Sequence, residues 1–150
     1  MSDRRLVVVG MTNPLSSDPR ASLRTSPPGC AGHRLWEMAS ARTGISEVAW
    51  LSMTDRRNLC VGDWSHQAAR QQAALWHDEL RGRTVLQLGL SVMCAMRVDG
   101  DTLRRPLEWH PNRDWVDVPH PSGRCRSYNS VVRAAVEILL AELVEMHRDQ

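Results

Sequence analysis

A continuous aliphatic run near the N-terminus is the feature that most constrains the fold of this chain. Leu6, Val7, Val8 and Val9 follow one another without a polar residue, and Gly10 closes the run. A short unbroken run rich in β-branched residues is typical of a strand that is buried on both faces. Such strands occur in parallel sheets covered by helices on both sides, so the run indicates an α/β fold.

The rest of the chain alternates between helical and extended patterns. Apolar residues recur at helical spacing over residues 31–42, 65–81, 91–97 and 130–147. Short apolar runs predict further strands over residues 48–53, 84–89 and 115–119. Strands that alternate with helices form parallel sheets through right-handed crossovers. We therefore expect a single domain over residues 1–150, a three-layer αβα sandwich with a short central parallel sheet of about four strands.

Composition excludes several classes of protein. A hydrophobic fraction of 42% with a net charge of only +2 excludes a disordered chain of 150 residues. The apolar runs fall far short of the roughly 20 residues of a membrane span. Residues 1–5 also lack the apolar core of a signal peptide. We therefore expect a cytoplasmic protein without a membrane partner.

The basic residues and the cysteines are both unusual. All 19 basic residues are arginines; a GC-rich genome explains this bias, and arginine chosen for phosphate contacts is the alternative. The four cysteines are far apart and form no CxxC pair, whereas zinc and cluster sites use closely spaced cysteines. We expect free thiols, no metal and no cofactor.

Polar segments follow three of the predicted strands. Residues 11–32 follow the first, residues 54–64 the second and residues 120–129 the fourth. In open α/β sheets the ligand binds beyond the carboxyl ends of the strands. The residues of these three polar segments are therefore expected at one edge of the sheet.

Two of these polar segments carry candidate chemistry. The first is Gly-Met-Thr-Asn-Pro at residues 10–14, which is also compatible with an ordinary turn after a strand. The second begins with His-Pro-Ser-Gly-Arg at residues 120–124. Its two flanking prolines restrict the backbone of His120, while its serine and arginines suit a phosphate. The alternative is a polar loop that caps the last helix through Asn129 or Ser130.

Together the two segments resemble the signature motifs of the uracil-DNA glycosylase superfamily: a strand ending in Gly-x-x-Asn-Pro, and a later strand ending in His-Pro-Ser. Residues 28–35 resemble the Ala-Gly-x-Arg-Leu segment that opens the first helix of bacterial and phage members. Asn58-Leu59 resembles the Asn-Leu after their second strand, and Leu88-Gly89 the end of their third. The resemblance covers roughly residues 6–140 in the right order. It implies the superfamily's fold, a short parallel sheet between helices.

The resemblance implies an enzyme that flips a base out of DNA and cleaves its N-glycosidic bond. His120 matches the residue that stabilises the departing base, and removing such a donor costs roughly 3–4 kcal/mol. Asn13 matches the residue that positions the attacking water; an amide orients water but cannot accept its proton. The other positions assigned to substrate or DNA binding are Gly10, Thr12, Pro14, Gly32, Arg34, Asn58, Pro121, Ser122, Gly123, Arg124 and Arg126.

The chain also departs from the family pattern. Its first motif is one residue longer than the commonest form, so Thr12 or Asp18 is an alternative to Asn13. The third strand offers Gln87 where many uracil-specific members carry an asparagine that reads the pyrimidine edge. In place of the usual aromatic residue after the first motif, the candidates for stacking on a base are Trp36, Trp64 and His33.

We expect a monomeric DNA glycosylase-like enzyme with His120 and Asn13 as catalytic residues and DNA as partner. The alternative is a relative of the same fold that binds a base, nucleotide or DNA end without hydrolysis, in phage base modification or defence. A hydrolase with Ser122 as nucleophile is a third interpretation, but Ser122 lacks the Gly-x-Ser-x-Gly context of such enzymes.

Overall fold

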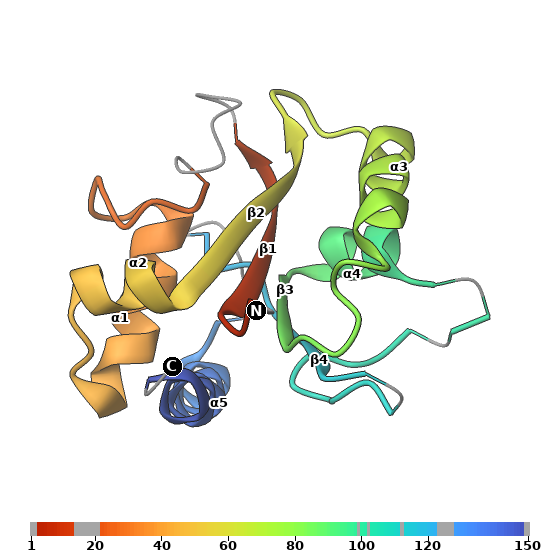
Figure 1. The fold of residues 1–150 in the computed structure, drawn as a ribbon. Coiled ribbons are helices and arrows are strands. Elements are labelled where there is room, and N and C mark those ends of the chain that lie inside the picture. The colour runs from red at the N-terminus through yellow and green to blue at the C-terminus, as the bar shows by residue number, and fades with distance from the viewer. Residues whose placement is uncertain are drawn as a thin grey trace.

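The computed structural model describes residues 3–13, 22–98, 100, 101, 103–111, 113–122 and 128–148. Within them, four parallel strands form one sheet: β1 (Leu6–Asn13), β2 (Thr54–Val61), β3 (Val85–Leu88) and β4 (Trp115–Val118). The helices are α1 (Ala31–Thr43), α2 (Glu47–Met53), α3 (His66–Trp76), α4 (Leu90–Met96) and α5 (Ser130–His147). The sheet lies between two layers of helices (Figure 1), which confirms the expected αβα sandwich.

β1 is a central strand, because the sheet order is β2-β1-β3-β4. Leu6 and Val8 face the cluster formed with α1, α2 and α5. Val7 and Val9 face the cluster formed with α3 and α4. All four side chains are fully buried, which explains why the run contains no polar residue.

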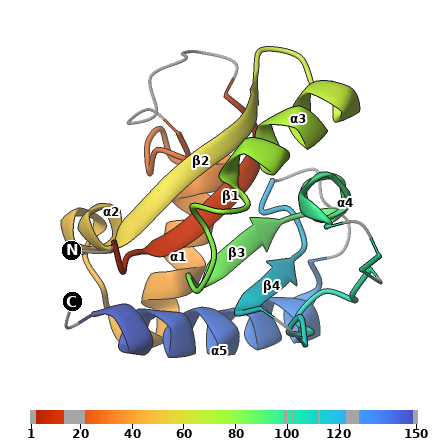
Figure 2. The ribbon, with the colours of Figure 1, turned by 45° about the vertical axis from the view of Figure 1, so that its right-hand side comes forward.

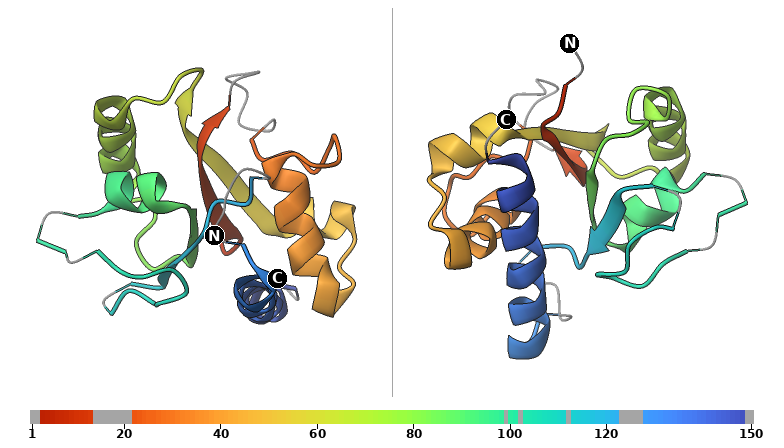
Figure 3. Two further views of the ribbon diagram at one scale, coloured as in Figure 1. Left: turned by 180° about the vertical axis from the view of Figure 1, so that it is seen from behind. Right: turned by 60° about the horizontal axis from the view of Figure 1, so that its bottom comes forward.

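One face of the sheet is covered by α1, α2 and α5 (Figure 3). Leu35 and Met38 of α1 pack with Leu140 and Leu143 of α5 in the core. α1 ends where Gly44 adopts a φ of 66° and donates its N–H to Ser40 O at 2.8 Å, a left-handed cap that glycine adopts readily.

The opposite face is covered by α3 and α4, which lie in front of the sheet in Figure 2. Ala69 and Ala73 of α3 are fully buried, and their small side chains let the helix approach the sheet. Arg70 projects from α3 and donates to the carbonyls of Cys94 and Ala95 at 3.3 Å. This guanidinium satisfies carbonyl groups that the end of α4 leaves without helical partners.

The prediction of a strand over residues 48–53 is wrong, and so is the prediction of a loop over residues 54–64. Residues 48–53 belong to α2, whose first turn is capped by Ser46 through a hydrogen bond from Ala49 N at 3.1 Å. The strand is instead β2, inside the segment expected to be a loop. A six-residue apolar run has no periodicity long enough to separate helix from strand. β2 is an edge strand, whose polar residues obscure the strand pattern.

The remaining elements agree with the sequence except at their ends. The helix predicted over residues 65–81 ends at Trp76 and continues as turns, and β1 extends to Asn13. α5 begins and ends where the sequence predicts. Within the described part of the chain, none of the helices combines the length and apolar character needed to cross a lipid bilayer.

Candidate functional site

The strand order places a topological switch point at the carboxyl edge, the edge of the sheet where the strands end at residues 13, 61, 88 and 118. From β1 the chain first adds β2 on one side and then β3 and β4 on the other. The order therefore reverses between β1 and β3, and such switch points are where open α/β sheets bind ligands. Asn13 ends β1, and His120 follows β4 by two residues. One strand, β3, separates β1 from β4 in the sheet.

Asn13 is buried at the end of β1, with 7% of its surface exposed. Its carbonyl accepts a hydrogen bond from Gly62 N at 3.2 Å, which ties the end of β1 to the turn after β2. Side chains alternate along a strand, and Met11 packs against the α3–α4 cluster. The alternation therefore puts the amide of Asn13 on the α3–α4 face.

His120 is half-buried against the end of β3. A Cβ built on Gly89 would lie 3.1 Å from the Cβ of His120, and Gly89 has a φ of 97°. Only glycine suits both the conformation and the contact at this position. Burial lowers the pKa of His120 below its ordinary value, so the ring is neutral at neutral pH and carries one N–H donor. The segment is further held by Tyr128, whose hydroxyl donates to Pro119 O at 2.6 Å.

Three of the predicted binding residues, Arg34, Pro121 and Ser122, line one hollow of about 330 Å³. It lies between α1 and the start of α5, and Arg133 of α5 also lines it. Arg34 is exposed and donates from Nε to Gly29 O at 3.0 Å. Two guanidinium groups and a serine hydroxyl make this hollow suitable for a phosphate.

Gly10, Gly32 and Asn58 gather around Leu23. A Cβ on Gly32 would lie 2.2 Å from Arg24 O, and one on Gly10 would lie 3.0 Å from Asn58 Nδ2 and 3.2 Å from Leu23 Cδ2. Both glycines therefore permit close packing of the segment before α1. Asn58 lies inside β2, opposite Gly10, rather than after the strand as predicted.

The side chain of Asn58 is incompletely satisfied. Its Oδ1 is buried and has no hydrogen-bond partner among the described residues. Thr12, which is half-buried, is two residues beyond Gly10 on the same face of β1. An unpaired buried amide oxygen is costly, so this position suits a water molecule or a ligand donor.

Two buried polar residues need a new interpretation: the sequence does not single out Asp117, and it assigns Gln87 a different role. Asp117 of β4 and Gln87 of β3 lie opposite each other in the sheet and are 2% and 5% exposed. Both line a cavity of about 30 Å³, enough for a water molecule. Burial raises the pKa of Asp117 to about 7, against a smaller opposing effect of the Gly89 N–H. The signal was present, since a carboxylate interrupts an otherwise apolar strand.

The proposed stacking residues have structural roles. Trp36 packs against the core and donates from Nε1 to Ile45 O at 3.1 Å. His33 Nδ1 is 2.8 Å from Thr25 O, and its Nε2 pairs with Glu37. Trp64 packs beside the α3–α4 cluster.

Five of the residues considered for the site from the sequence have no described position. Pro14, Asp18, Gly123, Arg124 and Arg126 lie outside the described residues. Among the residues that are described, no group of three or more His, Cys, Asp or Glu side chains is arranged to hold a metal ion. Cys30, Cys60 and Cys94 are free thiols.

Comparison of the chain with models of known protein families finds no match, and comparison with curated proteins also finds none. Function is therefore inferred from the geometry of the carboxyl edge and from the resemblance of the motifs.

Proposed function

We propose that the chain is a DNA glycosylase-like enzyme that flips a damaged or modified base into the carboxyl edge and cleaves its N-glycosidic bond. The observation that carries this proposal is the state of His120. It is a half-buried imidazole with a lowered pKa, fixed against Gly89 next to the switch point of the sheet. A neutral, oriented N–H donor stabilises negative charge on a departing base without requiring the site to hold a second charge.

The hollow lined by Arg34 and Ser122 supports DNA as the substrate. A flipped nucleotide brings its flanking phosphates to the protein surface, and guanidinium and hydroxyl groups bind phosphate oxygens. Gly123, Arg124 and Arg126 lie outside the described residues and stay predicted DNA-binding residues on the strength of the motif resemblance. Gly10, Gly32 and Asn58 pack around Leu23, and in this proposal Asn58 Oδ1 accepts a hydrogen bond from the base or from water.

A second candidate is a relative of the same fold that binds a base without hydrolysing its bond. The placement of Asn13 favours it, because strand alternation turns its amide toward the α3–α4 face while Ser122 lines a hollow beside α1. An amide also cannot take a proton from the attacking water. In this version the carboxyl edge holds the flipped base, and no hydrolysis follows.

The test is incubation with oligonucleotides that contain uracil, mismatched, hydroxymethylated or glycosylated bases, scored for abasic sites. The His120→Ala variant is expected to release base roughly 100- to 1000-fold more slowly than the native chain. His66→Ala is the matched control, because His66 is an exposed histidine at the start of α3, and it should keep the native rate.

Two results would separate the candidates. A native chain that forms no abasic sites, but binds one of these oligonucleotides with an affinity that Arg34→Ala lowers, would support the binding protein. Equal base release by the native chain and by His120→Ala would refute the catalytic role of His120.

A further inference from the structure

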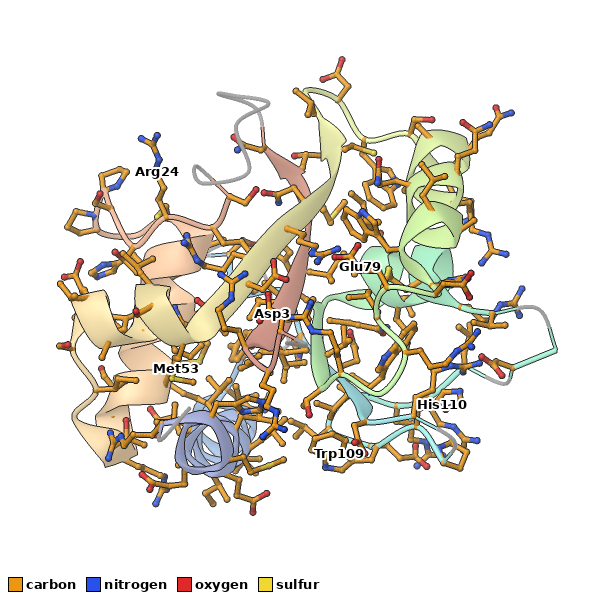
Figure 4. All side chains as sticks on the ribbon, in the orientation of Figure 1. Asp3, Arg24, Met53, Glu79, Trp109 and His110 are labelled. Atoms are coloured by element: carbon orange, nitrogen blue, oxygen red, sulfur yellow. The ribbon has the colours of Figure 1, made fainter. Side chains whose placement is uncertain are left out.

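A second hollow lies at the opposite edge of the sheet, where β3 and β4 begin. It has a volume of about 740 Å³, within the usual range of ligand sites. Its walls are the connection from α3 to β3 and the segment before β4. We call it the amino-edge groove and define it by His77, Arg81, Arg83, Trp109, Arg113 and Trp115. Figure 4 shows Trp109 and His110 at this end of the molecule, away from the tips of β1 and β2.

The groove has an aromatic floor and an aromatic rim. Trp115 is 7% exposed and forms the floor, with the His77 ring centroid 6.3 Å away and the Arg113 guanidinium 5.3 Å from its ring. Trp109 is 38% exposed. Its backbone is held by a bridge to Val116 and by the bond from His110 N to Trp115 O at 2.9 Å. An exposed indole on a fixed backbone offers a flat surface on which a base can stack.

The lining of the groove also carries three arginines and one aspartate, and each arginine is paired with a carboxylate. Arg83 is held by Asp55 at 3.1 Å, and Arg113 by Asp101 at 2.6 Å. Arg81 differs, because both it and its partner Asp78 are more than 80% exposed. Such an exposed pair contributes little, so the Arg81 guanidinium can turn to an anion in the groove.

We propose that the amino-edge groove binds a nucleotide unit, with the base stacked on Trp109 and the phosphate held by Arg81. Neither feature alone selects this ligand; the combination of an exposed indole with an exposed guanidinium around one hollow does. The groove is separate from the carboxyl edge, so the proposal does not depend on glycosylase activity. The same chemistry is offered by a free nucleotide and by a nucleotide within single-stranded DNA.

The test follows the six tryptophan indole N–H signals in proton–nitrogen correlation spectra of the full chain. The probes are thymidine monophosphate, thymidine, inorganic phosphate and a short oligothymidylate. We expect thymidine monophosphate or oligothymidylate to shift the Trp109 signal, which Trp109→Phe identifies by its disappearance. Arg81→Glu should weaken binding roughly tenfold, and Trp109→Ala roughly fivefold or more. Arg42→Glu, an exposed arginine in the last turn of α1, should bind as the native chain does.

The arms of this experiment distinguish the sources of the ligand. If thymidine monophosphate binds as tightly as the oligothymidylate, the ligand is a free nucleotide. If the oligothymidylate is the one probe that binds tightly, and its binding is sensitive to salt, the ligand is a DNA strand. His120→Ala should leave either result unchanged, which separates this proposal from the one at the carboxyl edge. The proposal is overturned if neither nucleotide probe shifts the Trp109 signal, if inorganic phosphate alone gives the same shift, or if Arg81→Glu binds like the native chain.

Discussion

Asp117 shows how much one residue can change the properties of an otherwise apolar strand. It is 2% exposed, and its Oδ1 has no partner within the described part of the structure. Its backbone carbonyl accepts the N–H of Leu107 at 2.6 Å, so the residue also fixes the segment before β4. Because burial raises its pKa to about 7, the protonated acid is the form that the folded protein favours below about pH 7.

Stability should therefore depend on pH through Asp117. The pKa rises from 3.8 to about 7 on folding, so the folded chain binds this proton more tightly than the unfolded chain. The contribution is fully present below pH 3.8 and is lost as the pH rises through 7, by up to about 4 kcal/mol. Asp117→Asn does not titrate, so its unfolding free energy relative to the native chain should rise between pH 5 and pH 8 in denaturant titrations.

The control for this prediction is Asp63→Asn, a change at an exposed aspartate after β2. It should follow the native pH profile. Parallel profiles for the native chain and Asp117→Asn would show that the carboxylate is already satisfied in the folded state.

At the scale of elements, the boundary between α2 and β2 is the part of the fold that the sequence pattern misassigns. Val48 is 79% exposed, whereas Trp50 and Met53 are buried, which is the spacing of a short amphipathic helix. Arg57 in β2 is held by Asp55 at 2.9 Å and lies over the Trp76 ring of α3. Polar residues are accommodated in this strand because it pairs with β1 alone.

Removing the cap of α2 tests this assignment. Ser46→Ala leaves the Ala49 N–H without its acceptor and should lower the unfolding free energy by about 1 kcal/mol. Ser46→Asp keeps an acceptor at the cap and should stay within a few tenths of a kcal/mol of the native chain. If thermal or denaturant unfolding shows no effect of Ser46→Ala, residues 47–53 do not depend on a helix cap.

At the scale of the whole molecule, a network of ion pairs joins segments that are distant in the sequence. Arg83 precedes β3 and binds Asp55 of β2 at 3.1 Å and Asp3 near the N-terminus at 3.5 Å. Arg57 binds both Asp55 and Glu79. Burial alone would raise the pKa of Asp55, but the hydrogen bonds and charge of Arg57 outweigh burial and leave the pKa below its ordinary value.

The two acids on Arg57 should differ in importance because they differ in exposure, 13% for Asp55 and 53% for Glu79. Asp55→Asn leaves two largely buried guanidinium groups without their shared anion and should lower the unfolding free energy by about 3 kcal/mol. Glu79→Gln removes an exposed partner and should cost less than about 1 kcal/mol. Equal losses from the two variants in denaturant titrations would contradict this explanation.

The sequence predicts part of the candidate site and leaves part undetermined. It predicts that Asn13 and His120 follow strands of one parallel sheet, because each comes after a short apolar run. It does not predict which face of the sheet each side chain occupies, since that depends on the register at the strand end. It also assigns Asn58 to a loop, because the polar residues of β2 conceal an edge strand.

Local sequence patterns establish the α/β class, three of the four strands and both ends of α5, because these depend on periodicity and on residues adjacent in the chain. The tertiary structure alone decided the order β2-β1-β3-β4 and therefore the position of the switch point. It also decided the contact of His120 with Gly89, the burial of Asp117 and the joining of Trp109 with Arg81 around one groove. These depend on contacts between segments far apart in the chain, which no local pattern encodes.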